Sequence, residues 1–144
     1  MNTPQKTQLH KHSVMPSCLQ LSLKTKWFEM TKAGIKKEDY REINRYWSKR
    51  FIYNLKDVLL HTGRNVIDFI EDKDAYDFVT NPRSSFGFKD FEINLMTLGY
   101  PKSTDTERIL KLEHRGIEIR TGNPEWGAEL NKLYFVIMHG TILA

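Results

Sequence analysis

Residues 19–41 read LQLSLKTKWFEMTKAGIKKEDYR, and this stretch decides the fold. Leucine alternates with polar residues over 19–24, which predicts a strand with one buried face. Thr25 is suited to cap a short helix, and Gly34 is suited to end that helix in a left-handed conformation. The stretch therefore predicts a strand, a short helix and a sharp turn in succession.

Residues 36–43 also alternate, but neither face of the predicted strand is apolar. This pattern fits a strand that lines a polar cleft, and it equally fits an edge strand with two solvated faces. Lys36 and Arg41 are five positions apart, so on an ideal strand they point to opposite sides. Both can face one cleft only if the chain bends between them.

The remaining chain predicts one longer helix and several strands. Asn44 is placed to cap a helix over 45–61 that Gly63 ends. Alternation predicts further strands over 91–96, 109–113, 117–120 and 133–138. In the first of these, the apolar face is formed by Phe91, Ile93 and Leu95.

The two strand segments around Gly116 have apolar residues of opposite parity. Leu110 and Leu112 occupy even positions, whereas Ile117 and Ile119 occupy odd ones. A single strand can bury all four only if its facing changes once. The sequence therefore predicts a β-bulge at Gly116.

About five strands and two or three helices predict an α+β fold, a small curved sheet or β-barrel. Residues 1–17 are polar and predict a flexible leader. Residues 18–144 then form one domain, with an acidic helical insertion at about 57–85.

The composition is that of a soluble domain. The 144 residues are 40% hydrophobic and 28% charged, with a mean hydropathy of -0.54. The single cysteine, Cys18, excludes an internal disulfide, and no apolar run approaches the roughly 20 residues that a membrane span needs. A cytoplasmic protein without a membrane partner is expected.

Positive charge is concentrated in the first third of the chain. Residues 1–50 hold eleven Lys/Arg and four Asp/Glu, whereas residues 51–144 hold eleven Lys/Arg and fourteen Asp/Glu. This asymmetry favours an anionic partner such as nucleic acid. A solvated basic face on an ordinary protein is the other interpretation.

Part of the chain resembles the ASCH domain, a PUA-like β-barrel. The resemblance is carried by Leu21–Ser22–Leu23–Lys24, Trp27–Phe28, Gly34-x-Lys36-x-x-Asp39-x-Arg41, Gly99–Tyr100 and Glu125–Trp126–Gly127. It covers roughly residues 19–50 and 88–143 and resembles the phage and bacterial members. It implies a cleft beside the loop that contains Lys36, and a ligand that is RNA or a modified nucleoside.

Basic and aromatic residues of the first third predict the binding surface, because cations attract phosphate and aromatic rings stack on bases. The candidates are Lys24, Lys26, Lys36, Tyr40, Arg41, Arg45, Tyr46 and Lys49. Trp27 and Trp47 lie on the predicted apolar helix faces, so we expect them to belong to the core rather than to stack on a base.

Hydrolysis is the alternative function. ASCH proteins that deacetylate N4-acetylcytidine use the lysine of this motif, a threonine and a later glutamate, and other members are ribonucleases. Here Lys36 matches, but Asp39 stands at the threonine position, and either Glu113 or Glu118 is the candidate glutamate. An aspartate there predicts an ion pair with Lys36 in place of a nucleophilic hydroxyl.

No cofactor or metal site is predicted. His61, His114 and His139 are scattered along the chain, and His114 shares a strand face with leucines, which is typical of a core histidine. A third class of function is a phage-type interaction module, in which the acidic insertion binds a protein partner.

Overall fold

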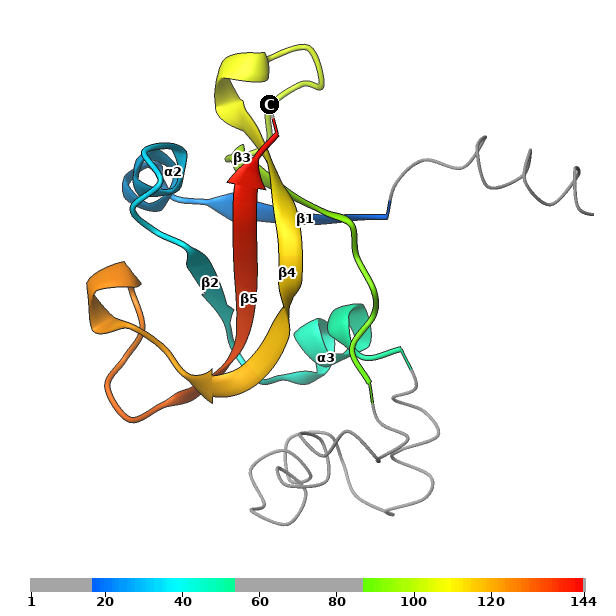
Figure 1. Ribbon diagram of the computed structural model, residues 1–144, viewed down its shortest axis with the longest axis vertical. Coiled ribbons are helices and arrows are strands. Elements are labelled where there is room, and N and C mark those ends of the chain that lie inside the picture. Colours follow the sequence, from blue (N-terminus) through cyan, green and yellow to red (C-terminus); the bar gives the residue numbers. More distant parts are fainter. Residues whose placement is uncertain (1–16, 54–86, 144) are drawn as a thin grey trace, which may run out of the picture.

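The computed structural model describes residues 17–53 and 87–143, which form a small α+β unit (Figure 1). Its elements are β1 (Cys18–Leu23), α2 (Thr25–Lys32), β2 (Glu38–Arg41), α3 (Arg45–Phe51), β3 (Ile93–Leu98), β4 (Ile109–Thr121) and β5 (Leu133–Ile142), with short 3-10 helices η1 (Thr106–Arg108) and η2 (Pro124–Trp126). The predicted acidic insertion, and all of the predicted leader except its last residue, lie outside the described residues.

The strands form one mixed sheet in the order β1-β3-β4-β5-β2. The pair β1 and β3 is parallel, and every other neighbouring pair is antiparallel. The sheet curls so that its two edge strands, β1 and β2, approach each other (Figure 1). The predicted α+β class with a curved five-stranded sheet is confirmed.

The concave face of the sheet holds the core. Leu19, Leu21 and Leu23 are buried along β1, as their alternation predicts. From α3, Phe51 packs edge-on against Phe135 of β5, with ring centroids 5.2 Å apart. Phe28 of α2 belongs to the same core cluster, so both helices bury one face against the sheet. No helix in the described segments is long and apolar enough to span a membrane.

The predicted change of facing in β4 is confirmed. The strand runs without interruption from Ile109 to Thr121, and its register with β5 shifts on both sides of His114. Gly116 has a φ of +113°, which a residue with a side chain rarely adopts. As a result the leucines before this point and the isoleucines after it are all buried.

Helix α3 is shorter than its sequence predicts. Asn44 caps its start, since the Asn44 side chain accepts from the Trp47 backbone N–H at 2.9 Å. The helix ends at Phe51 instead of His61, because Ile52 is extended and pairs with Phe88. Pairing with a distant segment thus overrides the helical periodicity. The rest of the predicted helix, from residue 54 on, lies outside the described residues.

The start of α2 also differs from the prediction. Lys24, not Thr25, is the capping residue, and no side chain caps this end. The predicted end is right, since Gly34 has a φ of +77°. The chain can therefore turn sharply after α2 and enter β2 with Lys36 directed inward, where it is only 3% exposed.

Candidate functional site

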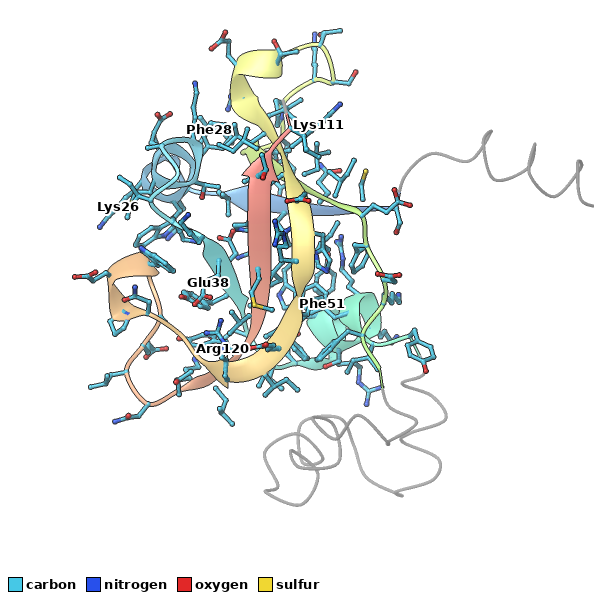
Figure 2. The ribbon with its side chains drawn as sticks, in the orientation of Figure 1. Lys26, Phe28, Glu38, Phe51, Lys111 and Arg120 are labelled. Atoms are coloured by element: carbon cyan, nitrogen blue, oxygen red, sulfur yellow. The ribbon has the colours of Figure 1, made fainter. Side chains whose placement is uncertain are left out.

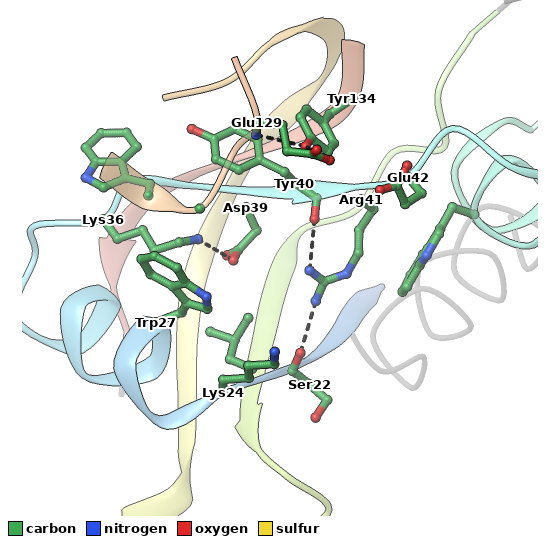
Figure 3. A pocket seen from close by; sticks show the side chains of 14 residues that line it. Ser22, Lys24, Trp27, Lys36, Asp39, Tyr40, Arg41, Glu42, Glu129 and Tyr134 are labelled. Carbon is green, nitrogen blue, oxygen red and sulfur yellow. Dashed lines mark hydrogen bonds and ion pairs between the residues drawn. The ribbon is translucent and has the colours of Figure 1, made fainter. Parts of the chain in front are cut away.

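A cleft of about 400 Å³ opens where the end of β1, the start of α2, strand β2 and the η2 loop meet (Figure 3). Its aromatic lining consists of Trp27, Tyr40, Trp47, Trp126 and Tyr134, and its charged lining consists of Lys24, Lys36, Asp39, Arg41, Glu42 and Glu129. The chain contains three tryptophans, so all of them line this cleft. The volume lies in the range of small-molecule sites, roughly 300–1,000 Å³.

A glycine brings the two sides of the cleft together. Gly127 follows η2 with a φ of +102°, and a Cβ at this position would lie 2.9 Å from the Trp27 ring. Glycine therefore allows both the left-handed turn and the close approach of the backbone to Trp27. This approach brings η2, which contains Trp126, next to α2.

Lys36 and Asp39 form a buried ion pair at the base of the cleft (Figure 3). The Lys36 Nζ also donates to the Glu38 backbone carbonyl at 2.6 Å. Burial lowers the pKa of Lys36, and the attraction to Asp39 opposes this effect without cancelling it. The ion pair that the sequence predicts is present, but the pKa of Lys36 still lies below that of an exposed lysine.

Asp39 begins a chain of buried polar groups that extends across the sheet. Its second oxygen accepts from His139 Nε2 at 2.7 Å, and His139 Nδ1 lies 2.8 Å from Asn94 Nδ2. The Asn94 Oδ1 lies 2.7 Å from His114 Nδ1. The polar chain therefore connects Lys36 in the cleft to His114 on β4, through the three buried side chains between them.

The Met138 backbone carbonyl determines which atoms of this polar chain carry protons. Asn94 Nδ2 also donates to the Met138 carbonyl at 3.2 Å, so the amide nitrogen, not its oxygen, faces His139. His139 Nδ1 must then accept, and its Nε2–H donates to Asp39. Burial alone would raise the pKa of Asp39, but the His139 hydrogen bond and the Lys36 charge lower it to about 2.

The carboxylates that line the cleft have cationic or hydrogen-bonding partners. Asp39 is held by Lys36 and His139, while Glu42 and Glu129 accept from Lys132 Nζ at 2.7 and 3.0 Å. Because one lysine serves both glutamates, it offsets one of their two charges and the other remains.

Two cations of the cleft have no such partner. Within the two described segments, no carboxylate lies in ion-pair range of Lys24 or Arg41. The Arg41 guanidinium donates only to backbone carbonyls, that of Tyr40 at 3.0 Å and that of Ser22 at 3.1 Å (Figure 3). Its charge remains available to a ligand, and the second bond joins edge strand β2 to edge strand β1.

Five of the predicted site residues line the cleft: Lys24, Lys36, Asp39, Tyr40 and Arg41. The bend that this requires lies before β2, which begins at Glu38 and leaves Lys36 outside the strand. Strand β2 is an edge strand, and residues 39–41 line the cleft, as the first interpretation predicts. The two solvated faces of the second interpretation are wrong, because Asp39 is buried and the other three residues of β2 are partly buried.

The other predicted binding residues lie outside the cleft lining: Lys26, Arg45, Tyr46 and Lys49. Lys26 points away from the sheet, with its Nζ 4.8 Å from the Trp27 ring centroid (Figure 2). Tyr46 lines a neighbouring hollow. Trp27 and Trp47 pack against the core, as expected, and also line the cleft.

Neither candidate glutamate lines the cleft. Glu113 is bonded to Arg115 at 2.9 Å and accepts from the Thr141 backbone N–H at 3.1 Å. Glu118 is bonded to Arg120, also at 2.9 Å. The structure therefore does not bring either glutamate to Lys36 and Asp39.

Sequence reasoning missed the inner half of the site. His114 and His139 are not scattered, because they are paired in register on β4 and β5 and both reach Asn94. The expected facing of β3 is wrong, since Asn94 and Met96 point inward. The only sign of this polar chain in the sequence is His139, which directly follows the apolar run over 133–138. On the cleft wall, reasoning also passed over Trp126, Glu129 and Tyr134.

Comparison with protein-family models, with curated proteins and with solved structures found no match. Among the residues whose positions are described, no three histidine, cysteine or acidic side chains gather in a way that could hold a metal ion. The candidate function must therefore be argued from the cleft itself.

Proposed function

We propose that the cleft binds a base of single-stranded RNA or a free, modified nucleoside. The observation that carries this proposal is that the cleft is lined by every tryptophan of the chain and by two cations, Lys24 and Arg41. Neither cation has an ion-pair partner among the described residues. Aromatic faces stack on any base, and unpaired cations attract the phosphate beside it. All three tryptophans line the cleft, and those at 27 and 47 also pack against the core.

Tryptophan fluorescence tests this proposal directly, because every tryptophan lines the cleft. We expect titration with a cytidylate hexanucleotide to quench or shift the emission. Affinity should fall with salt, with a log–log slope of about -0.7 for each phosphate contact. RNA binding that changes anisotropy but not tryptophan emission would place the RNA elsewhere, and absence of binding would reject the proposal.

Charge variants at the two ends of α2 give a matched comparison of RNA affinity. Lys24 precedes the helix and lines the cleft, whereas Lys32, in its last turn, is exposed and lies outside the lining. We expect Lys24→Gln to weaken RNA binding several-fold and to reduce the salt slope by about 0.7. Lys32→Gln removes the same charge and should change the affinity less than Lys24→Gln. Equal effects would indicate a diffuse electrostatic attraction instead of a cleft.

Hydrolysis in the same cleft remains the alternative, and the surroundings of Asp39 argue against it. Both carboxylate oxygens are engaged, one by Lys36 and one by His139, so neither is free to attack a substrate. We expect no release of acetate when the protein is incubated with N4-acetylcytidine. Turnover that disappears in Lys36→Arg while binding persists would establish the hydrolase function instead. The interaction-module alternative depends on the acidic insertion, which lies outside the described residues.

A further inference from the structure

A second hollow adjoins the cleft and shares one wall with it. It measures about 480 Å³ and is lined by residues of β1, α3 and the end of β3. Ser22, Arg41 and Trp47 line both hollows, so these three residues form the wall between them. A ligand that leaves the first cleft over Arg41 enters the second directly.

The second hollow repeats the chemistry of the first. Its exposed aromatic residues are Tyr46, 58% exposed, and Tyr100, 91% exposed. Aromatic rings with this much free surface offer area on which a base can stack. They stand apart from the first cleft, on α3 and on the turn after β3.

Two arginines meet at the shared wall. The Arg41 and Arg50 guanidinium carbons lie 5.2 and 5.4 Å from the ring centroid of Trp47, so both cations contact one indole. The Arg50 Nη2 donates to the Gln20 carbonyl at 3.4 Å, which leaves its charge unneutralised. Across residues 17–53 and 87–143, no carboxylate lies in ion-pair range of either arginine.

Arg41 and Arg50 carry like charges beside one indole ring, so they repel each other. Burial is the largest cause of the lowered pKa of Arg41; the charge of Asp39 opposes it, and the charge of Arg50 adds to it. A phosphate between them removes this repulsion and offers oxygens that match the planar donors of a guanidinium. A wall that carries positive charge therefore separates two hollows lined by aromatic residues.

We infer that the protein binds a strand of single-stranded RNA across this wall, with one base in each hollow and the connecting phosphate at Arg41 and Arg50. This inference rests on the proposed function and names its ligand as a strand of at least two nucleotides. A free nucleoside fills only the first cleft. A duplex does not fit, because its bases are stacked on each other and present no free face to the tyrosines.

The test compares cytidine with a cytidylate hexanucleotide on the full chain, with tryptophan fluorescence as the readout. We expect the hexanucleotide to bind at least tenfold more tightly, because each stacked base and each phosphate contact adds affinity. In Arg50→Gln the ratio of the two affinities should fall about tenfold, and the salt slope for the hexanucleotide should decrease by about 0.7.

Two controls isolate the second hollow. Lys102→Gln removes an equal charge two positions after Tyr100, from a residue that lines neither hollow, and it should change the ratio less than about twofold. Tyr100→Ala should lower the ratio, while Tyr100→Phe, which keeps the ring, should preserve it. Thermal unfolding of each variant verifies that the fold is intact.

The outcomes separate the two proposals. If cytidine binds and the hexanucleotide binds no more tightly, or if Arg50→Gln and Lys102→Gln lower the ratio equally, the two-hollow inference is wrong and the proposed function stands. If neither ligand changes the tryptophan emission, the proposed function itself fails. An effect of Arg50→Gln and Tyr100→Ala together, with rescue by Tyr100→Phe, supports the strand across the wall.

Discussion

Arg41 and Arg120 lie on two strands of the same sheet but have opposite surroundings. Arg120 is bonded to Glu38 at 2.6 Å and to Glu118 at 2.9 Å, and it connects β4 to β2 on the outer face (Figure 2). Arg41 has only backbone acceptors. The comparison teaches that a paired guanidinium stabilises the fold, whereas an unpaired one keeps its charge for a ligand. Variants of paired and unpaired charges test this distinction.

The largest loss of stability is expected when the buried ion pair of Lys36 and Asp39 is broken. Asp39→Asn leaves the Lys36 ammonium buried with no countercharge, which costs about 3–5 kcal/mol of unfolding free energy. Denaturant unfolding measures this loss. The double variant Lys36→Met, Asp39→Asn removes both charges and should recover most of it. A double variant no more stable than Asp39→Asn would show that the charge pair is not the cause.

Acid should destabilise the protein in two steps. Burial and, to a smaller extent, the nearby His139 lower the pKa of His114, and the negative charge of Asp90 opposes them without cancelling them. The unfolded chain therefore takes up a proton first as the pH falls below about 6.5. Stability therefore decreases from neutral pH toward pH 5. A second loss of about 2 kcal/mol follows between about pH 4 and 2, because Asp39 has a folded pKa of about 2.

Unfolding measured from pH 7.5 to 2 checks both steps. His114→Gln keeps a donor for Asn94 Oδ1 but does not titrate, so the first step should become shallower while the second remains. An unchanged first step in this variant would assign it to another group. Lys36 has a lowered folded pKa as well, so the loss of stability that it causes begins as the pH falls below about 10.5, above the start of this scan.

Substitution of two glycines separates the effect of backbone strain from the effect of a side chain that presses on the cleft. Gly127→Ala and Gly99→Ala both place a side chain at positive φ, +102° and +68°, and each should cost about 1–3 kcal/mol. Only the first also presses on Trp27, since a Cβ at position 99 has Arg108 as its nearest neighbour at 3.4 Å. Gly127→Ala should weaken the binding of cytidine, which fills only the first cleft, in the fluorescence titration, and Gly99→Ala should not. Equal binding by both variants would contradict the proposed role of this side of the cleft.

The smallest effect on stability tests the opening comparison itself. Arg120→Gln breaks bonds to two carboxylates in a partly exposed site, and we expect a loss of about 1 kcal/mol with RNA affinity within twofold of the natural chain. Arg41→Gln should reduce RNA affinity by about tenfold. The two variants measured side by side, by unfolding and by fluorescence, should give opposite profiles. Similar profiles would remove the distinction between paired and unpaired arginines.

Local patterns predicted the frame of the molecule. The alternation of β1, the glycine after α2, the Asn44 cap and the bulge at Gly116 each depend on residues close in the sequence. Five residues of the cleft were also predictable, because the motif around Lys36 places them within one short segment of chain.

The buried polar chain could not be predicted, because it is made by register. Asn94 meets His139 only through the pairing of β3, β4 and β5, and its facing was ambiguous since both faces of β3 carry apolar residues. The early end of α3 has the same origin, because Ile52 pairs with Phe88 from a distant segment. Long-range pairing leaves little trace in a local pattern.

The bond from Arg41 to Ser22 has a further consequence for how copies of this protein meet. The outer side of edge strand β1 presents backbone acceptors, and such an edge is a template for a strand of another molecule. Arg41 and Arg50 occupy the carbonyls of Ser22 and Gln20, so this edge lacks two of the acceptors that intermolecular pairing requires. The residues that we assign to RNA binding therefore also protect the sheet from aggregation.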